Sequence, residues 1–118
     1  MKHAFIIHAS PAENGRAFHA LTHARQAHER GDETALYFAS EGTAWPALLA
    51  AETHPFHGLF AYARDNGVLK GACENCAAAF GHTASAGAVC TLVKGPAASY
   101  GQIDMLGLHD AGFHVWIF

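Results

Sequence analysis

The sequence lacks clustered charge and long hydrophobic runs. It has 7 Lys and Arg residues against 10 Asp and Glu residues, the formal net charge is -3, and the basic residues are scattered along the chain. Nucleic acids and anionic membranes attract clustered basic residues, so we expect neither as a partner. The N-terminal apolar run covers only Ala4–Ile7, whereas a membrane span needs about 20 apolar residues. A signal peptide also needs a longer apolar region and a small-residue cleavage site, so neither segment is expected.

Cysteine is also scarce. The chain has three cysteines, and an odd number argues against the disulfide framework that is typical of small secreted domains. The simplest compartment is therefore a reducing one, and we expect a cytoplasmic protein.

Several catalytic and cofactor motifs are missing. The sequence contains no G-x-S-x-G, P-loop or H-E-x-x-H pattern, so it offers no motif-based prediction of a serine hydrolase, a nucleotide-binding protein or a zinc protease. After the first predicted strand stands His8-Ala9-Ser10-Pro11 instead of a glycine-rich phosphate-binding loop. We therefore expect no cofactor.

The remaining composition is typical of one globular domain. The chain has 118 residues, of which 51% are hydrophobic and 14% are charged. This composition supplies enough apolar side chains for a core, and the length fits a single domain over residues 1–118.

Strand and helix patterns alternate along the chain. Short apolar runs next to breaking residues predict five strands, at Lys2–His8, Glu33–Ala39, Val68–Cys73, Ala88–Val93 and Phe113–Phe118. Helical spacing predicts helices over Arg16–Arg30, Pro46–Glu52, Phe56–Asp65, Glu74–Phe80 and Ser99–Ala111, with a loop at His82–Gly87. This order predicts an α/β fold: one domain with a mostly parallel sheet of about five strands and helices on both faces.

Some residues in these segments carry more specific expectations. Gly31 follows the first helix, where a left-handed residue is common, and Thr43 precedes the second, where it would act as the N-cap. Two helix faces are expected to be apolar: Phe18, Leu21 and Ala24 in the first helix, and Ile103, Met105 and Leu106 in the last. The aromatic C-terminal stretch predicts either a core strand or a self-association surface.

Polar or reactive residues follow four of the predicted strands. They are His8, Ser10, Ser40, Glu41, Cys73 and Lys94. Because parallel strands end at the same edge of a sheet, we expect these side chains to lie near one another, where ligands of such sheets bind. The alternative is that they are ordinary loop residues, since loops are commonly polar.

Cys73 is the strongest candidate for chemistry within this set. It ends a predicted strand and directly precedes a helix, whose unpaired amide groups favour a thiolate, the reactive form of cysteine. The neighbouring Glu74 carboxylate opposes ionisation, and His8 or Lys94 would offset it if they approach. The alternative is a buried cysteine that serves as a small hydrophobic residue.

Cys76 extends this candidate to a C-x-x-C pair, Cys73-Glu74-Asn75-Cys76. At the start of a helix both sulfurs of such a pair can face the same way and close a disulfide. Cys76 is followed by Ala77-Ala78-Ala79, a small-residue helix face, which favours a structural role for this second thiol. A metal site from Cys73, Cys76, His82 and Cys90 would need a closely spaced second pair. His82 and Cys90 stand eight residues apart, so no metal is expected.

The chain resembles the DsrE/DsrF-like family, which includes TusD-like sulfur-relay subunits and YchN-like proteins. The resemblance covers nearly the whole chain. It rests on the helix and strand of Arg16–Ser40, and above all on a third strand that leads through Gly71-Ala72-Cys73 into Ala77-Ala78-Ala79 and then Gly81. In the family, basic residues often precede this glycine. Here Phe80 precedes it and His82-Thr83 follows.

The resemblance implies a parallel α/β sheet, oligomers of two, three or six subunits, and sulfur passed between cysteine persulfides. It also implies that Cys73, rather than Cys76, carries the persulfide. The first hypothesis is therefore a sulfurtransferase-like sulfur carrier with a protein as sulfur donor or acceptor, supported by His8 or Lys94. The second is a non-catalytic oligomeric binding module in which Cys73 lines a pocket, and the third is a dithiol redox protein that uses the C-x-x-C pair.

Overall fold

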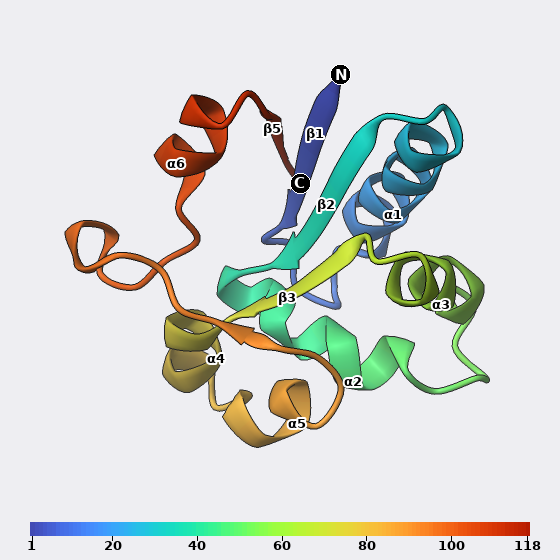
Figure 1. Ribbon diagram of the computed structural model, residues 1–118. Helices are drawn as coiled ribbons and strands as arrows, with labels where there is room; N and C mark the ends of the chain where they lie inside the picture. The colour runs from blue at the N-terminus through green and yellow to red at the C-terminus, as the bar shows by residue number, and fades with distance from the viewer.

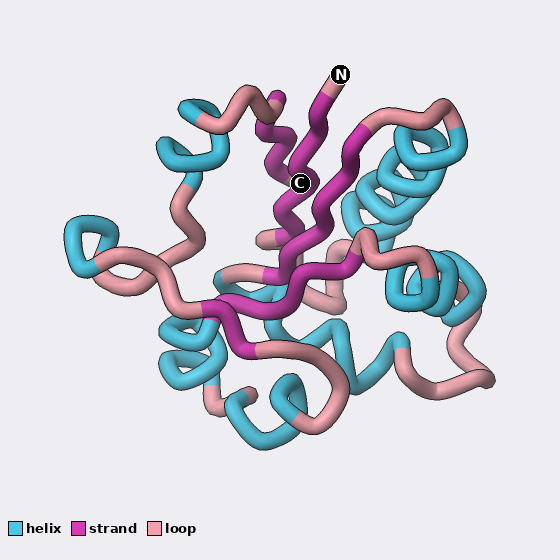
Figure 2. The backbone as a smooth tube through the Cα atoms, in the orientation of Figure 1, coloured by secondary structure: helices cyan, strands magenta, loops and turns pink.

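The structure is a computed structural model that describes residues 1–118. Five strands form one sheet in the order β4-β3-β2-β1-β5, and every neighbouring pair is parallel (Figures 1 and 2). The strands are β1 Lys2–Ile7, β2 Glu33–Phe38, β3 Leu69–Cys73, β4 Leu92–Val93 and β5 His114–Ile117. The predicted single-domain α/β fold is confirmed.

Short helices connect the strands. The α-helices are α1 Asn14–Glu29, α2 Trp45–Leu49, α3 His57–Asp65, α4 Glu74–Phe80, α5 Thr83–Gly87 and α6 Met105–Asp110, and two 3-10 helices are η1 Ser40–Ala44 and η2 Ala97–Ser99. Strands β1 to β4 step across the sheet in one direction, and the chain then returns to place β5 beside β1. Because parallel crossovers are right-handed, the connection from β4 to β5, which crosses the sheet in the reverse direction, lies on the opposite face of the sheet. Figure 1 accordingly has α1 and α3 on one side of the sheet and α6 on the other.

Helix α1 packs on β1 and β2 through a face of small side chains. Its buried residues are Ala17, Ala20, Leu21, Ala24 and Ala27. Gly31 follows the helix with φ +89, which confirms the predicted left-handed position. The prediction for Phe18 is wrong, because its side chain is 44% exposed and lies against Phe56, with ring centroids 5.2 Å apart.

The predicted cap at Thr43 is also wrong. Thr43 lies inside η1, where its hydroxyl donates to the Ser40 carbonyl at 3.0 Å, and the residue before α2 is Ala44. Helix α2 then ends at Leu49, short of the predicted Glu52. The backbone thus reaches α2 through a continuous helical turn and needs no side-chain cap.

The other differences fall in the second half of the chain. Residues 83–87 form α5 where a loop is predicted, and β4 shrinks to Leu92–Val93 because the end of α5 continues as turns through Cys90. Helix α6 starts only at Met105, where the Asp104 side chain accepts a hydrogen bond from the Gly107 N–H at 3.0 Å. Leu106, which we expected on the apolar face of this helix, is 76% exposed.

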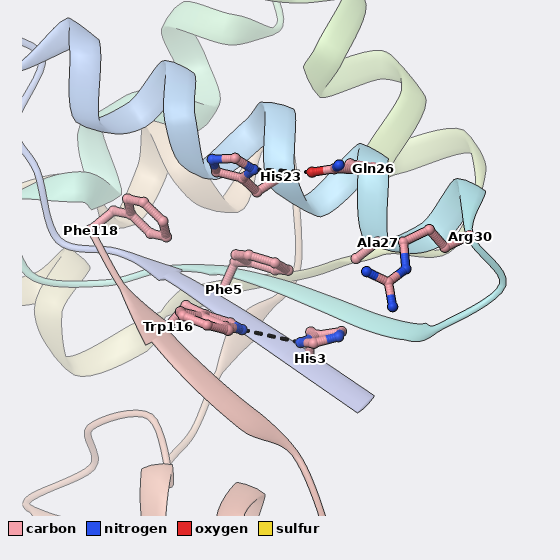
Figure 3. A pocket seen from close by; sticks show the side chains of 8 residues that line it. All are labelled: His3, Phe5, His23, Gln26, Ala27, Arg30, Trp116 and Phe118. Atoms are coloured by element: carbon pink, nitrogen blue, oxygen red, sulfur yellow. Dashed lines mark hydrogen bonds between the residues drawn. The ribbon is translucent and has the colours of Figure 1, made fainter. Parts of the chain in front are cut away.

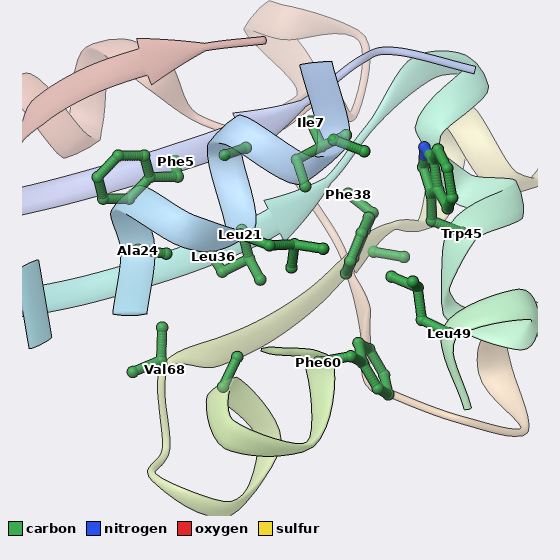
Figure 4. Packing of buried hydrophobic residues seen from close by; sticks show 14 of the residues in the cluster. Phe5, Ile7, Leu21, Ala24, Leu36, Phe38, Trp45, Leu49, Phe60 and Val68 are labelled. Carbon is green, nitrogen blue, oxygen red and sulfur yellow. The ribbon is translucent and has the colours of Figure 1, made fainter. Parts of the chain in front are cut away.

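The main core lies on the sheet face that α1, α2, α3 and α5 cover. Strand residues alternate, so one set of side chains points to this face, including Phe5, Ile7, Leu36 and Phe38 (Figure 4). Full burial of one such side chain contributes about 1.5–3 kcal/mol. Trp45 of α2 completes this core with no exposed surface, and its indole N–H donates to the Ala9 carbonyl at 2.8 Å.

The opposite face has a much smaller core. Its fully packed residues are Ile6, Ala39, Cys73 and Ile103. Helix α6 is the helix that contacts β5 there. Ile117 on β5 stays 51% exposed, so apolar surface remains open on this side.

Two glycines allow the close approaches that shape the carboxyl edge of the sheet. A Cβ atom on Gly42 would lie 2.1 Å from the Ile7 carbonyl oxygen, so the backbone of η1 is in close contact with the end of β1. Gly71 has φ +143, and a Cβ atom there would lie 2.2 Å from the Thr91 carbonyl oxygen. This residue brings the chain of Thr91 against β3, two residues before Cys73.

Candidate functional site

A cavity of about 280 Å³ opens at the carboxyl ends of the strands. Its lining comes from the residue after β1, the residues after β2, helix α4 and the chain that leads into the start of α6: His8, Ala39, Ser40, Asn75, Cys76, Ala79, Phe80, Gln102, Ile103 and Met105. Of the residues expected to gather at this edge, His8 and Ser40 line the cavity, and Cys76 joins them from α4. This is the position at which parallel α/β sheets bind ligands.

Cys73 lies beneath this cavity, at the junction of β3 and α4. It is the N-cap of α4, and its sulfur accepts a hydrogen bond from the Cys76 N–H at 3.2 Å. The same thiol donates to the Gly101 carbonyl at 3.8 Å. The predicted position against the helix amides is therefore confirmed. Cys73 has no exposed surface in the single chain, as in the alternative of a buried cysteine.

Burial also decides the ionisation of Cys73. It raises the pKa of the thiol to about 11, and the hydrogen bond with the Cys76 thiol adds to the increase. The N–H groups of Asn75 and Cys76 act in the opposite direction, but their effect is smaller than the cost of an unsolvated thiolate. Cys73 is thus a neutral thiol at neutral pH, contrary to the sequence expectation of partial ionisation.

Cys76 is the member of the pair that faces the cavity. It lies on α4, is half-buried and contributes to the cavity lining, and neither cysteine forms a disulfide. The Cys73 sulfur lies 3.2 Å from the Cys76 N–H, so a group that enters the cavity meets the Cys76 thiol first and Cys73 behind it. Ala77 is the buried residue of α4, and Ala79 joins Cys76 in the cavity lining.

His8 is the one histidine in the cavity lining. Partial burial lowers the pKa of its imidazole, so the ring is neutral at neutral pH and can accept a proton. It does not supply the positive charge that would stabilise a thiolate. Ser40 lies beside it in the lining and has φ 51, a left-handed conformation that is uncommon outside glycine.

Two predicted supporting residues are not part of the lining. The Ser10 hydroxyl accepts the Ala12 N–H at 3.3 Å and so stabilises the turn after β1. The Lys94 ammonium lies 4.0 Å from the Glu74 carboxylate, and its side chain is 80% exposed. This pair partly neutralises Glu74, but an exposed pair of this kind contributes at most about 1 kcal/mol.

The residues considered for a metal site are held apart by other partners. The Cys90 thiol donates to the Ala86 carbonyl at 3.6 Å, and the His82 ring pairs with the Thr43 hydroxyl at 2.9 Å. Nowhere in the chain do three or more His, Cys, Asp or Glu side chains form a group that would hold a metal ion.

The sequence reasoning missed several lining residues. Asn75 was visible inside the C-x-x-C motif, whereas Gln102, Ile103 and Met105 reach the cavity only because the chain returns across this edge toward β5. That return depends on the strand order, which no local pattern indicates. Phe80, 47% exposed, completes the rim.

Comparisons with known proteins place the chain in a family. The model of the DsrE/DsrF-like family matches residues 1–113. The uncharacterized protein MJ0733 of Methanocaldococcus jannaschii is 32% identical over 84 residues, which cover 68% of this chain and 67% of that protein. No solved structure matches significantly, and no helix of the chain is long and apolar enough to cross a membrane. The chain therefore belongs to the DsrE/DsrF-like family, and this membership supports a sulfur-relay-like role at the level of the family.

Proposed function

We propose that the chain is a sulfurtransferase-like sulfur carrier in which Cys73 and Cys76 act as a pair. The observation that carries this proposal is their arrangement: Cys76 lines the cavity, and the Cys73 sulfur lies behind it and accepts the Cys76 backbone N–H at 3.2 Å. Cys73 occupies the cysteine position of the family resemblance. In this proposal Cys76 accepts sulfur at the cavity and Cys73 stores it.

The reaction consists of two exchanges at sulfur. The Cys76 thiolate attacks the outer sulfur of a donor persulfide, R–S–SH, so that one S–S bond forms, the donor S–S bond breaks, and the donor leaves as a thiolate. Cys73 then attacks the outer sulfur on Cys76, which yields a Cys73 persulfide and regenerates the Cys76 thiol. Neutral His8 accepts the proton of the attacking thiol and returns it to the leaving sulfur. Sulfur is transferred without net oxidation.

Intact-protein mass spectrometry tests the proposal. The purified chain is mixed with a cysteine desulfurase and cysteine, and fragmentation locates the added sulfur. We expect a reducible addition of sulfur on Cys73 in the wild type and on Cys76 in Cys73→Ser. Loading of Cys76→Ser should be at least about tenfold slower, because its remaining thiol, Cys73, is buried and neutral, whereas the thiolate is the attacking form. Cys90→Ser is the matched control and should load normally. Unaltered loading of Cys76→Ser, or no loading beside a competent carrier protein, would contradict the mechanism.

A dithiol redox protein is the second candidate. The C-x-x-C pair at the first turn of α4, with both thiols free and the Cys73 sulfur bonded to the Cys76 N–H, favours it. The two candidates differ in the product that forms on the C-x-x-C pair. A redox protein forms a reversible Cys73–Cys76 disulfide that Cys76→Ser abolishes, and it retains no added sulfur.

The partner we propose for the carrier is a protein sulfur donor or acceptor, together with further copies of this chain. The open apolar surface around Leu106 and Ile117 supports self-association. In a purely structural oligomer Cys73 would only line a pocket, and Cys73→Ser would leave every interaction intact. Three free thiols suit a reducing compartment, and we propose the cytoplasm.

A further inference from the structure

A second cavity of about 290 Å³ lies away from the thiols, between α1 and the β1–β5 edge of the sheet (Figure 3). Strand β5 joins β1 on the side away from β2, beyond the helices that cover the main core. The aromatic side chains of the edge are therefore left beside α1 with open space above them. The lining residues are His3, Phe5, His23, Gln26, Ala27, Arg30, Trp116 and Phe118.

Aromatic rings form one wall of this cavity. Phe5 and Trp116 are register partners in β1 and β5, and their rings are stacked, with centroids 6.5 Å apart and planes 14° apart. Phe118 lies next to Phe5, with centroids 6.4 Å apart. Such a surface suits the flat face of another aromatic ring.

Hydrogen bonds hold the polar end of the cavity in place. The Trp116 indole N–H donates to His3 Nδ1 at 3.1 Å, so the His3 proton lies on Nε2, which faces Asp32 Oδ2 at 3.2 Å. Arg30 lies 3.3 Å from the same carboxylate oxygen. These linked contacts orient the indole, His3 and Arg30 before any ligand binds, which lowers the free-energy cost of binding.

The charge of the lining points to an anion. Arg30 is the only lining residue with a fixed charge, and no acidic side chain contributes to the lining. Its guanidinium has five N–H donors, of which the contact with Asp32 uses few, so donors remain for a carboxylate. Figure 3 shows Arg30 and His3 at one end of the cavity and Phe118 at the other.

We propose that this cavity is a binding site for a planar aromatic carboxylate of one or two rings. The ring packs against Phe5, Trp116 and Phe118, and the carboxylate accepts hydrogen bonds from Arg30. The cavity is at the lower end of the size range of small-molecule sites, about 300–1,000 Å³, which limits the ligand to one or two rings. The proposal does not depend on the sulfur chemistry, because none of the three cysteines lines this cavity.

Isothermal titration calorimetry with 2-naphthoate tests the site on the full chain. We expect binding to the wild type, at least about tenfold weaker binding to Arg30→Gln, since a charge-assisted hydrogen bond is lost, and unchanged binding to Arg25→Gln. Arg25 is the matched control, because it lies on the same helix but pairs with Glu29 at 2.7 Å. A second variant, Trp116→Ala, should also weaken binding, and circular dichroism checks that each variant is folded.

Two further probes separate the aromatic and the charged contributions. Cyclohexanecarboxylate keeps the charge but lacks the flat ring, and 2-naphthylmethylamine keeps the ring but reverses the charge, so both should bind at least about tenfold more weakly than 2-naphthoate. Equal binding of the amine, equal binding by Arg30→Gln, or no binding of 2-naphthoate would each overturn the proposal. Binding that disappears as the chain self-associates would assign the cavity to a second copy and overturn it as well.

Discussion

The two faces of the sheet are covered very differently. On one face, four α-helices close over 17 buried residues, among them Phe38, Trp45 and Phe60. On the other, the connection between β4 and β5 covers four buried residues, and the side chains of Leu106 and Ile117 remain largely exposed. Both faces belong to the same five strands, so the difference arises from the connections and not from the sheet.

This difference separates stability from function. The face covered by α1, α2, α3 and α5, called the thick face below, holds most of the buried apolar area that drives folding. The opposite face, called the thin face, contains Cys73 and borders the cavity lined by Cys76 through Ile103 and Met105. A site that must admit a partner protein or a persulfide belongs where few contacts have to be broken, and elements with few buried contacts open most easily.

The largest expected effect is a loss of stability on the thick face. Trp45→Ala removes a side chain with no exposed surface and leaves the Ala9 carbonyl without its 2.8 Å donor, so we expect the free energy of unfolding to fall by about 3–5 kcal/mol. Leu48→Ala on the same helix, where the side chain is 44% exposed, should cost less than about 1 kcal/mol. Urea denaturation measures both. Equal losses would mean that α2 does not contribute to the core in solution.

A backbone change next to the thin face should cost slightly less. In Gly71→Ala the new Cβ meets the Thr91 carbonyl oxygen at 2.2 Å, and the φ of +143 is unfavourable for alanine, so we expect a loss of about 3 kcal/mol. Gly15→Ala is the control, because nothing lies within 4 Å of its Cβ position. That variant should gain up to about 1 kcal/mol from helix propensity. If Gly71→Ala were neutral, the tight contact between β3 and Thr91 would be refuted.

The elements that sequence reasoning predicted well are those whose signals are local. The apolar run of β1 and the glycine after α1 each identify an element by short-range patterns, and the parallel α/β architecture follows from their alternation. Helix α5 was missed because its five small residues, TASAG, have no apolar spacing. Phe18 was misjudged because alanines, rather than the largest side chain, face the sheet.

The candidate site was predicted only in part, for a reason of the same kind. His8 and Ser40 were named because each follows a strand, Cys76 was named as part of the C-x-x-C pair, and the shared edge brings the three together. The burial of Cys73 entered the sequence analysis only as the alternative, since the covering Ile103 and the Gly101 carbonyl come from the return toward β5. Helix position alone therefore predicted the contact with amide groups correctly and the ionisation incorrectly.

The third prediction uses pH to test the burial of Cys73. Its pKa is raised from 9.0 to about 11 in the fold, so between these values the unfolded chain loses the thiol proton while the folded chain keeps it. The stability contributed by this thiol is therefore present below pH 9 and is lost as the pH rises to 11, by about 2 kcal/mol. Urea denaturation across this range should show a shallower decline for Cys73→Ala than for the wild type. Cys76→Ala should fall between the two, because it removes only the smaller contribution that the Cys76 thiol makes to the raised pKa of Cys73, and an unchanged slope in Cys73→Ala would mean that the thiol is solvated.

The smallest expected change in stability comes from the exposed side chains of the thin face. Leu106→Ser and Ile117→Ser replace side chains that are 76% and 51% exposed, so each should alter the free energy of unfolding of the single chain by no more than about 0.5 kcal/mol. Their effect should appear instead in self-association, because exposed apolar surface next to the thin core is what a second copy would cover. Sedimentation velocity should show the double variant with a weaker tendency to associate than the wild type, while Leu48→Ser on the thick face associates normally. A wild type that stays monomeric at every concentration, or a double variant that associates equally well, would contradict self-association through this face.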